Sequence, residues 1–323
     1  MRTRGLLHEP RISMNSTPTN IRGIVPPLIT PMADRDAIDR PGLERLIAHQ
    51  LNGGVDGLFV LGTTGEGPSL SEKLRREMIT RCNQFIDGKV SLYVGITDTS
   101  LVGAIELAQF AADNGATAVV AAPPFYFPAG QTELCHWFTQ LAELLPLPLL
   151  LYNMPSCTKI VIEHETLSAL IEQDNVIGLK DSSGDLEYLA GAVKLASSKR
   201  PDWPVLIGPE ALLIEAMALG AVGGVAGGAN LVPRLFTELF AAANASDWTT
   251  VETLQKIVTE LQELYTFGKY GSSYLKGVKC AMELTGICCG ALAAPFDVFK
   301  NTERRRVQTW LDRFSAYGYL PDF

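Results

Sequence analysis

Apolar runs alternate with helix-period segments along most of the chain, from residue 21 onward. The runs are apolar at successive positions rather than at every second one, which is typical of parallel strands that are covered on both faces. Most of them begin about 30 residues apart, which is the length of one strand plus one helix. We therefore predict eight strands, which lie at Gly23–Ile29, Gly57–Leu61, Ser91–Ile96, Ala118–Ala122, Leu147–Tyr152, Val176–Lys180, Val205–Ile207 and Val222–Ala226.

The segments between the runs carry helix signals. Apolar residues at positions 43, 46, 47 and 51 share one face of a helix that Asp39 is placed to cap and that Gly53-Gly54 ends. Ser69 or Ser71 is suited to cap the next helix. The seventh and eighth runs lie so close together that the helix between them, near Leu212–Leu219, must be small.

Eight successive βα units predict an α/β fold of the (β/α)₈ (TIM) barrel type. We place the barrel at residues 21–232 and assign residues 233–323 to the closing helix and a C-terminal helical extension, in which 251–265, 274–284 and 310–314 look helical. An open doubly wound sheet is the alternative, but no predicted strand is followed by G-x-G-x-x-G and an acidic residue. Residues 1–20 are polar and lack the apolar stretch of a signal peptide, so we expect a flexible N-terminal tail there.

Composition and charge exclude several classes of partner. Of the 323 residues 47% are hydrophobic, which is enough for a sizeable core, and the net charge of −8 argues against binding to nucleic acid or to an anionic membrane. No apolar stretch reaches the length of about 18 residues that a membrane span needs. The six cysteines form no C-x-x-C pair and the four histidines show no H-x-H or H-E-x-x-H spacing. We therefore expect a cytoplasmic protein without a zinc site.

Lys180 is the first candidate for chemistry. It ends the apolar run that starts at Val176 and precedes the polar turn Asp181–Asp185. A lysine at the inner end of a buried strand is partly removed from water, which favours the neutral amine that a Schiff base requires. A lysine that extends from a strand end into solvent is the simpler interpretation of this residue taken alone.

Other polar groups follow the remaining strands, where a barrel places its active site. Thr63, Thr64 and Gly65 follow the second strand, and the backbone N–H groups of this turn are suited to bind a carboxylate. Tyr126 and Tyr152 follow the fourth and fifth strands and carry phenols that can relay a proton. Each of these residues taken alone is better explained as structural, but hydroxyls, phenols and an amine together favour imine formation followed by proton transfer.

The eighth strand leads into the glycine-rich segment 223–230, which contains Gly224 and Gly228. Glycines at this place admit a bulky substrate close to the backbone, or allow tight strand packing, and the sequence gives both readings equal weight. We take Gly224 and Gly228 as candidate substrate-binding residues.

Four motifs in this order resemble the dihydrodipicolinate synthase / N-acetylneuraminate lyase family of class I aldolases, from about residue 21 to the end of the chain. They are G-T-T-G-E at 62–66, P-x-Y at 124–126, Y-N-x-P at 152–155 and G-x-K-D-S at 178–182. The resemblance implies a (β/α)₈ barrel with a C-terminal helical extension. It also implies a homotetramer built as a dimer of dimers, and an enzyme that needs no cofactor because a covalent lysine imine carries the reaction.

The resemblance also implies roles for the candidate residues. Lys180 forms a Schiff base with pyruvate or another 2-oxo acid, and Tyr152 relays a proton over the imine. Thr63 and Thr64 bind the carboxylate of the 2-oxo acid and pass the proton onward. Tyr126 matches a phenol that reaches into the site of a neighbouring subunit.

One position departs from the family pattern. Synthases of the family carry Y-N-x-P-x-R-T-G, in which the arginine binds the carboxylate of the aldehyde substrate, and Cys157 occupies the position of that arginine. A thiol cannot form the bidentate ion pair that arginine makes with a carboxylate. Lys159 is a partial substitute, as a point charge two residues away.

The resulting prediction is a class I lyase or aldolase that forms a lysine Schiff base with pyruvate or another 2-oxo acid. It cleaves or condenses a 2-keto-3-deoxy sugar acid or a hydroxy-oxo acid, so that its partners are a small 2-oxo acid and an aldehyde. The alternatives are 4-hydroxy-tetrahydrodipicolinate synthase of lysine biosynthesis, N-acetylneuraminate lyase and a dehydratase on the same scaffold. A non-catalytic sensor of 2-oxo acids is a further alternative, although a sensor has no need of a proton relay.

Overall fold

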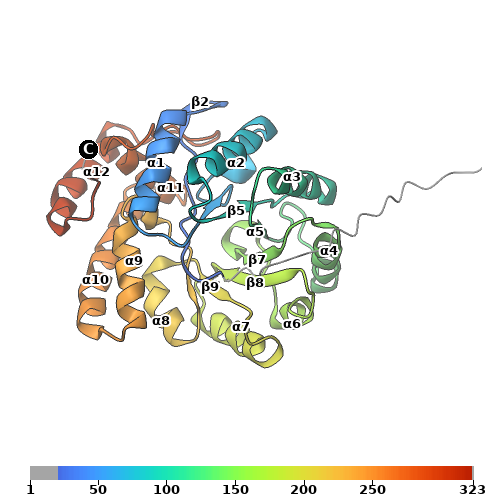
Figure 1. Ribbon diagram of the computed structural model, residues 1–323. Helices are drawn as coiled ribbons and strands as arrows, with labels where there is room; N and C mark the ends of the chain where they lie inside the picture. The colour runs from blue at the N-terminus through green and yellow to red at the C-terminus, as the bar shows by residue number, and fades with distance from the viewer. Residues whose placement is uncertain (1–20, 322–323) are drawn as a thin grey trace, which may run out of the picture.

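Eight parallel strands lie at the centre of the molecule and helices surround them (Figure 1). The computed structural model describes residues 21–321, so the predicted tail at residues 1–20 lies outside the described residues. All eight predicted strands are confirmed, as is the barrel fold. The strands are β1 (Gly23–Ile24), β4 (Gly57–Val60), β5 (Ser91–Gly95), β6 (Ala118–Ala121), β7 (Leu149–Asn153), β8 (Val176–Asp181), β9 (Val205–Ile207) and β10 (Gly223–Gly224).

The sheet closes through the segment that follows β1. The strand order is β1-β10-β9-β8-β7-β6-β5-β4, with every neighbouring pair parallel. The N–H of Leu28 donates to the carbonyl of Phe59 at 2.8 Å, and the N–H of Phe59 donates to the carbonyl of Pro26 at 3.0 Å, which joins β1 to β4. The ladder of β1 is short because Pro26 and Pro27 have no N–H to donate. The open doubly wound sheet is therefore wrong.

Two apolar clusters fill the fold. The smaller one lies inside the barrel and includes Phe59, Tyr93, Leu150, Tyr152 and Leu206. The larger one lies between the outer face of the sheet and the helices that cover it. Because both faces of each strand are buried, the strands read in the sequence as continuous apolar runs.

The predicted helix caps are found in the structure. The helix α1 (Arg40–Asn52) begins at Asp39, whose carboxylate accepts from the N–H of Gly42 at 3.0 Å. The cap of α2 (Glu72–Ile86) is Ser71, because Ser69 belongs to a 3₁₀ turn, η1 (Gly67–Ser69). As predicted, α8 (Leu213–Ala218) is short.

The remaining outer helices follow in regular order, together with one element that was not predicted. A small antiparallel hairpin, β2 (Met32–Asp34) with β3 (Ala37–Ile38), precedes α1. The helices are α3 (Leu101–Asp113), α4 (Gln131–Leu144), α5 (Pro155–Thr158), α6 (His164–Leu170), α7 (Leu186–Lys199) and α9 (Pro233–Asn244).

Three further helices lie against the side of the barrel formed by α1 and α9 (Figure 1). They are α10 (Trp248–Leu261), α11 (Ser273–Leu284) and α12 (Asn301–Phe314), and a 3₁₀ turn, η4 (Gln262–Thr266), follows α10 directly. The helix predicted at 251–265 thus ends earlier as an α-helix, whereas the one predicted at 310–314 is the last part of a longer helix. None of the helices within residues 21–321 is both long and apolar enough to cross a membrane.

Asp39 joins the start of the barrel to the end of the chain. Besides capping α1, its carboxylate accepts from the N–H of Cys289 at 2.8 Å. Partial burial acts to raise the pKa of Asp39, but hydrogen bonds from the N–H groups of Cys289 and Gly42 outweigh it and hold the pKa below its usual value.

We predict that Asp39→Ala lowers the free energy of unfolding by about 1–2 kcal/mol near neutral pH, because two backbone N–H groups lose their acceptor. A carboxyl with a lowered folded-state pKa stabilises above its unfolded pKa of about 3.9, and this contribution is lost as the pH falls through the folded-state pKa. The difference in the free energy of unfolding between the wild type and the variant should therefore become smaller below about pH 4. Urea unfolding over a pH series measures it, with exposed Asp202→Ala as the control. A gap that does not change with pH contradicts the prediction.

Candidate active site

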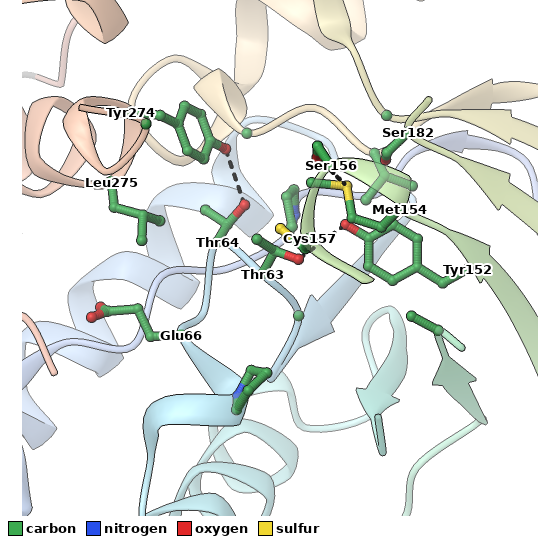
Figure 2. Close-up of a pocket in the computed structure, with 18 of the residues that line it drawn as sticks. Thr63, Thr64, Glu66, Tyr152, Met154, Ser156, Cys157, Ser182, Tyr274 and Leu275 are labelled. Carbon is green, nitrogen blue, oxygen red and sulfur yellow. Dashed lines mark hydrogen bonds between the residues drawn. The ribbon is translucent and has the colours of Figure 1, made fainter. Parts of the chain in front are cut away.

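The carboxyl ends of β4, β7 and β8 open into one cavity of about 690 Å³. Four of the predicted site residues line it, namely Thr63 and Thr64 after β4, Tyr152 on β7 and Lys180 on β8. In Figure 2 the hydroxyls of Thr63 and Tyr152 point toward each other, whereas the hydroxyl of Thr64 points toward Tyr274. The structure therefore brings Thr63 and Tyr152, which are 89 residues apart along the chain, next to each other.

Lys180 is buried, with 4% of its surface exposed. In the strand register it pairs with Tyr152 on β7 and Leu206 on β9. Its Nζ lies 3.6 Å from the centroid of the Tyr152 ring and 5.3 Å from that of Phe59, and no carboxylate within residues 21–321 forms an ion pair with it. Aromatic faces attract a cationic nitrogen, so this place suits both the lysine and the cationic imine derived from it.

Tyr152 carries a phenol next to this amine. Its hydroxyl lies 3.2 Å from Oγ1 of Thr63, and either group is able to donate. The ring of Tyr152 meets Phe59 edge-on, with centroids 6.3 Å apart, which fixes its orientation. A phenol that lies next to a buried amine and contacts a second hydroxyl has the geometry of a proton relay.

Thr64 is held from another direction. Its Oγ1 lies 3.0 Å from the hydroxyl of Tyr274 on α11 (Figure 2). Gly65, the next residue of the turn, does not line the cavity. A Cβ on Gly65 would come within 2.8 Å of the carbonyl oxygen of Leu28, so the glycine allows the turn to pack closely on the segment after β1.

The glycine-rich segment 223–230 is packed against the C-terminal helices. Gly224 and Gly228 do not line the cavity, whereas Gly227 does. A Cβ on Gly228 would lie 2.8 Å from the hydroxyl of Tyr265, and one on Gly227 would overlap the hydroxyl of Tyr274. These glycines make room for two phenols of the same chain, and a substrate-binding role for Gly224 and Gly228 stays a prediction.

Tyr126 lies apart from the other candidates. Its side chain is 96% exposed, it does not line the cavity, and its backbone has φ +83°, which is rare for an L-residue. The structure of the single chain thus does not join Tyr126 to Thr63 and Tyr152.

A buried polar wall of the cavity was missed by the sequence analysis. Glu210 accepts from the hydroxyl of Tyr265 at 2.5 Å, from Nε2 of Gln262 at 2.9 Å and from the N–H of Gly228 at 2.6 Å. Burial raises the pKa of Glu210, although these hydrogen bonds act in the opposite direction. Burial also raises the pKa of Tyr274, so this phenol keeps its proton at neutral pH.

The sequence held a signal for one part of this wall. Glu210 comes three residues after β9, so the search at strand ends that found Lys180 would also have found it. Tyr265 and Tyr274 belong to the C-terminal helices, which a search at strand ends does not reach.

The cavity contains little charge that a substrate can use. Lys180 is the one cationic side chain among its described lining residues. The two carboxyl groups in the lining are engaged by the protein, Glu210 as above and Glu66 in a buried ion pair with Lys279. Lys159 does not line the cavity, because its Nζ donates to the carbonyl of Ser156 at 2.6 Å. The structure thus does not support Lys159 as a substitute for the family arginine, and that substitution stays a prediction.

The barrel, the buried lysine and the neighbouring phenol fit a lyase that works through a lysine imine. The sequence model of the Dihydrodipicolinate synthetase family matches residues 20–313, and the chain belongs to that family. Enzymes of this family use a lysine Schiff base with pyruvate, need no external cofactor and take an aldehyde as second substrate. The chain is accordingly a class I aldolase or lyase of this family, as the sequence predicted.

Similar proteins carry different activities in their names. A probable 2-dehydro-3-deoxy-D-pentonate aldolase of Escherichia coli is 29% identical over 93% of this chain and 98% of its own length. A 4-hydroxy-tetrahydrodipicolinate synthase of Methanopyrus kandleri is 31% identical over 94% and 98%. A solved structure described as dihydrodipicolinate synthase of Bacteroides thetaiotaomicron is 47% identical, with a TM-score of 0.87 and 90% and 98% of the two chains covered. The similarities establish the family but leave the second substrate open.

Proposed function

We propose that this enzyme is an aldolase that cleaves or forms a 2-keto-3-deoxy sugar acid or a related hydroxy-oxo acid. Pyruvate is the three-carbon product of the cleavage and the three-carbon substrate of the condensation. The second substrate of the enzyme is an uncharged hydroxyaldehyde. The observation that carries this proposal is the charge of the cavity, where Lys180 is the one cationic side chain in the described lining and Cys157 occupies the position of the family arginine. A carboxylate on the aldehyde would lose its hydration without gaining an ion pair.

The reaction begins when Nζ of Lys180 adds to the 2-oxo carbon and water leaves, which gives an imine. The cationic imine draws electrons from the C3–C4 bond as Tyr152 removes the proton of the C4 hydroxyl, so that an aldehyde departs and an enamine remains. A proton returned to C3 regenerates the imine of pyruvate, and water then releases pyruvate and the amine. Thr63 connects the phenol of Tyr152 to the carboxylate end of the substrate, consistent with the 3.2 Å separation of the two hydroxyls.

The second candidate is 4-hydroxy-tetrahydrodipicolinate synthase, the activity named for the Methanopyrus kandleri relative. The Bacteroides thetaiotaomicron structure carries the name dihydrodipicolinate synthase for this activity. That reaction shares the pyruvate imine but takes an aldehyde with a carboxylate and an ammonium group. The two candidates therefore differ in the aldehyde rather than in the use of Lys180.

We further propose that the enzyme is a homotetramer, a dimer of dimers, in which Tyr126 enters the site of a neighbouring subunit. Tyr126 and the adjacent Phe127 are 96% and 83% exposed, which is unusual for two large aromatic side chains in succession. The positive φ of Tyr126 supports a functional reason for its placement, because strained backbone persists where the surroundings require it.

We predict a reduced pyruvyl adduct on Lys180 after treatment with pyruvate and borohydride, because the hydride traps the imine. Intact-mass spectrometry measures the adduct, and peptide mapping locates it. Lys180→Ala is the control and should carry none. A wild-type protein that forms no adduct with any 2-oxo acid would overturn the catalytic proposal and favour the sensor.

We predict that Tyr152→Phe still forms the adduct but lowers kcat by about 10²–10⁴-fold, the usual contribution of a general acid–base group. The aldol cleavage rate measures this, with Tyr126→Phe assayed beside it. If Tyr126 serves a neighbouring site, Tyr126→Phe also loses turnover while the protein sediments as a tetramer. A Tyr152→Phe variant that keeps the wild-type kcat would exclude Tyr152 as the proton relay. An enzyme that is active as a monomer would exclude a role of Tyr126 in the site of a neighbouring subunit.

We predict that the wild-type enzyme prefers glyceraldehyde or glycolaldehyde over aspartate semialdehyde in condensation with pyruvate. Cys157→Arg should raise kcat/KM for aspartate semialdehyde about 10-fold or more, the effect of a charge-assisted hydrogen bond to the carboxylate. Cys157→Ser is the matched control, because it changes the side chain without adding charge. A wild-type enzyme that already prefers aspartate semialdehyde points to the synthase instead.

A further inference from the structure

Helix α11 holds the loop of residues 62–67, which we call the threonine loop, at two places. This loop carries Thr63 and Thr64, which both line the cavity. Inside the loop, the N–H of Gly67 donates to the carbonyl of Gly62 at 3.1 Å and the N–H of Glu66 donates to that of Thr63 at 3.0 Å. The loop is therefore a compact unit whose orientation depends on what holds it from outside.

The first contact is made by Tyr274. Its hydroxyl lies 3.0 Å from Oγ1 of Thr64, and Figure 2 shows the phenol turned from α11 toward the loop. The phenol has space because residue 227 is glycine, where a Cβ would overlap the hydroxyl. The ring of Tyr265 packs against it edge-on at 4.8 Å, and Tyr265 is in turn fixed by Glu210. Tyr274 thus has one defined orientation.

The second contact is a buried ion pair. Lys279 of α11 and Glu66 of the threonine loop are both fully buried and form a salt bridge. Lys279 Nζ also donates to the carbonyl of Ala291 at 2.7 Å, and Oε2 of Glu66 accepts from the N–H of Ala293 at 2.7 Å. Separating such a pair would leave a buried charge without a partner, which costs free energy. The ion pair therefore keeps Glu66 against α11.

The two contacts come from different turns of α11. Tyr274 and Lys279 are five residues apart on the helix, a rise of about 7.5 Å at 1.5 Å per residue. The threonine loop is therefore held by two separate side chains of one helix, one at Thr64 and one at Glu66.

We propose that Tyr274 is a positioning residue of this active site, which holds the hydroxyl of Thr64 so that it binds the carboxylate of the 2-oxo acid. A phenol is a good donor and a weak acceptor, since its oxygen lone pair is delocalised into the ring. When Tyr274 donates to Thr64, the single hydroxyl proton of Thr64 is left for the substrate carboxylate. This assigns to a residue of the same chain a task distinct from that of Tyr126, which we place in a neighbouring site. The inference rests on the proposed function.

The test is the pyruvate concentration that gives half-maximal adduct on Lys180 in a short borohydride pulse. Tyr274→Phe should raise this concentration about 3- to 10-fold, the effect of one hydrogen bond, and leave the maximal adduct unchanged. Tyr270→Phe is the matched control, because Tyr270 lies just before α11 and is 69% exposed. Gly227→Ala, which displaces the phenol without altering it, should have the same effect as Tyr274→Phe.

The Thr64→Val background separates positioning from a general structural role. If Tyr274 acts through Thr64, Tyr274→Phe has no further effect on half-saturation in that background. An unchanged half-saturation in Tyr274→Phe, or effects that multiply in the double variant, overturns the proposal and leaves the catalytic proposal intact. A wild-type protein without an adduct overturns both.

Discussion

The parallel register of β7 and β8 is the constraint on which the site depends. It pairs Tyr152 with Lys180, and because side chains alternate along a strand, both residues point into the barrel from neighbouring strands. A slip of one residue would turn one of the two side chains toward the outer helices. The register thus sets the 3.6 Å separation between Nζ and the phenol ring, and Phe59 from β4 limits the space on the other side.

The C-terminal helices complete what the barrel leaves open. Gly227 and Gly228, which follow β10, create a gap that the phenols of Tyr274 and Tyr265 occupy. The barrel contributes the amine of Lys180 and the phenol of Tyr152, whereas α11 and η4 contribute a wall of the cavity that contacts the threonine loop. Deep burial of a carboxyl such as Glu210 is tolerated because three donors satisfy it. The extension therefore lines the candidate site as well as packing in the core.

Local patterns predicted the strands, the caps and the central residues, because these features depend on neighbouring positions. Continuous apolar runs identified all eight strands, and Asp39 and Ser71 were recognisable as caps from their side chains. Lys180, Tyr152 and Thr63 were found because a barrel gathers its strand ends at one face. The contact of Thr64 with Tyr274 was not predictable in this way, because 210 residues separate the two. The sequence around Tyr274 also gives no sign that its side chain faces the cavity. Tyr126 is a different case, since the placement proposed for it involves a second subunit that the sequence of one chain does not display.

Under the proposed function, the charge of the cavity restricts the substrate in two stages. Once the imine has formed, its positive charge is matched by the carboxylate of the 2-oxo acid, and the aromatic faces of Tyr152 and Phe59 add to this attraction. For an aldehyde that carries a second carboxylate, the described lining offers no further cation. Lys279 already forms an ion pair with Glu66, and Lys159 does not line the cavity. An uncharged hydroxyaldehyde needs only hydrogen-bond partners, which the hydroxyls and backbone groups of the lining supply. In the proposed function, the absence of a cation would thus let an enzyme that shares the imine mechanism of the family select a different aldehyde.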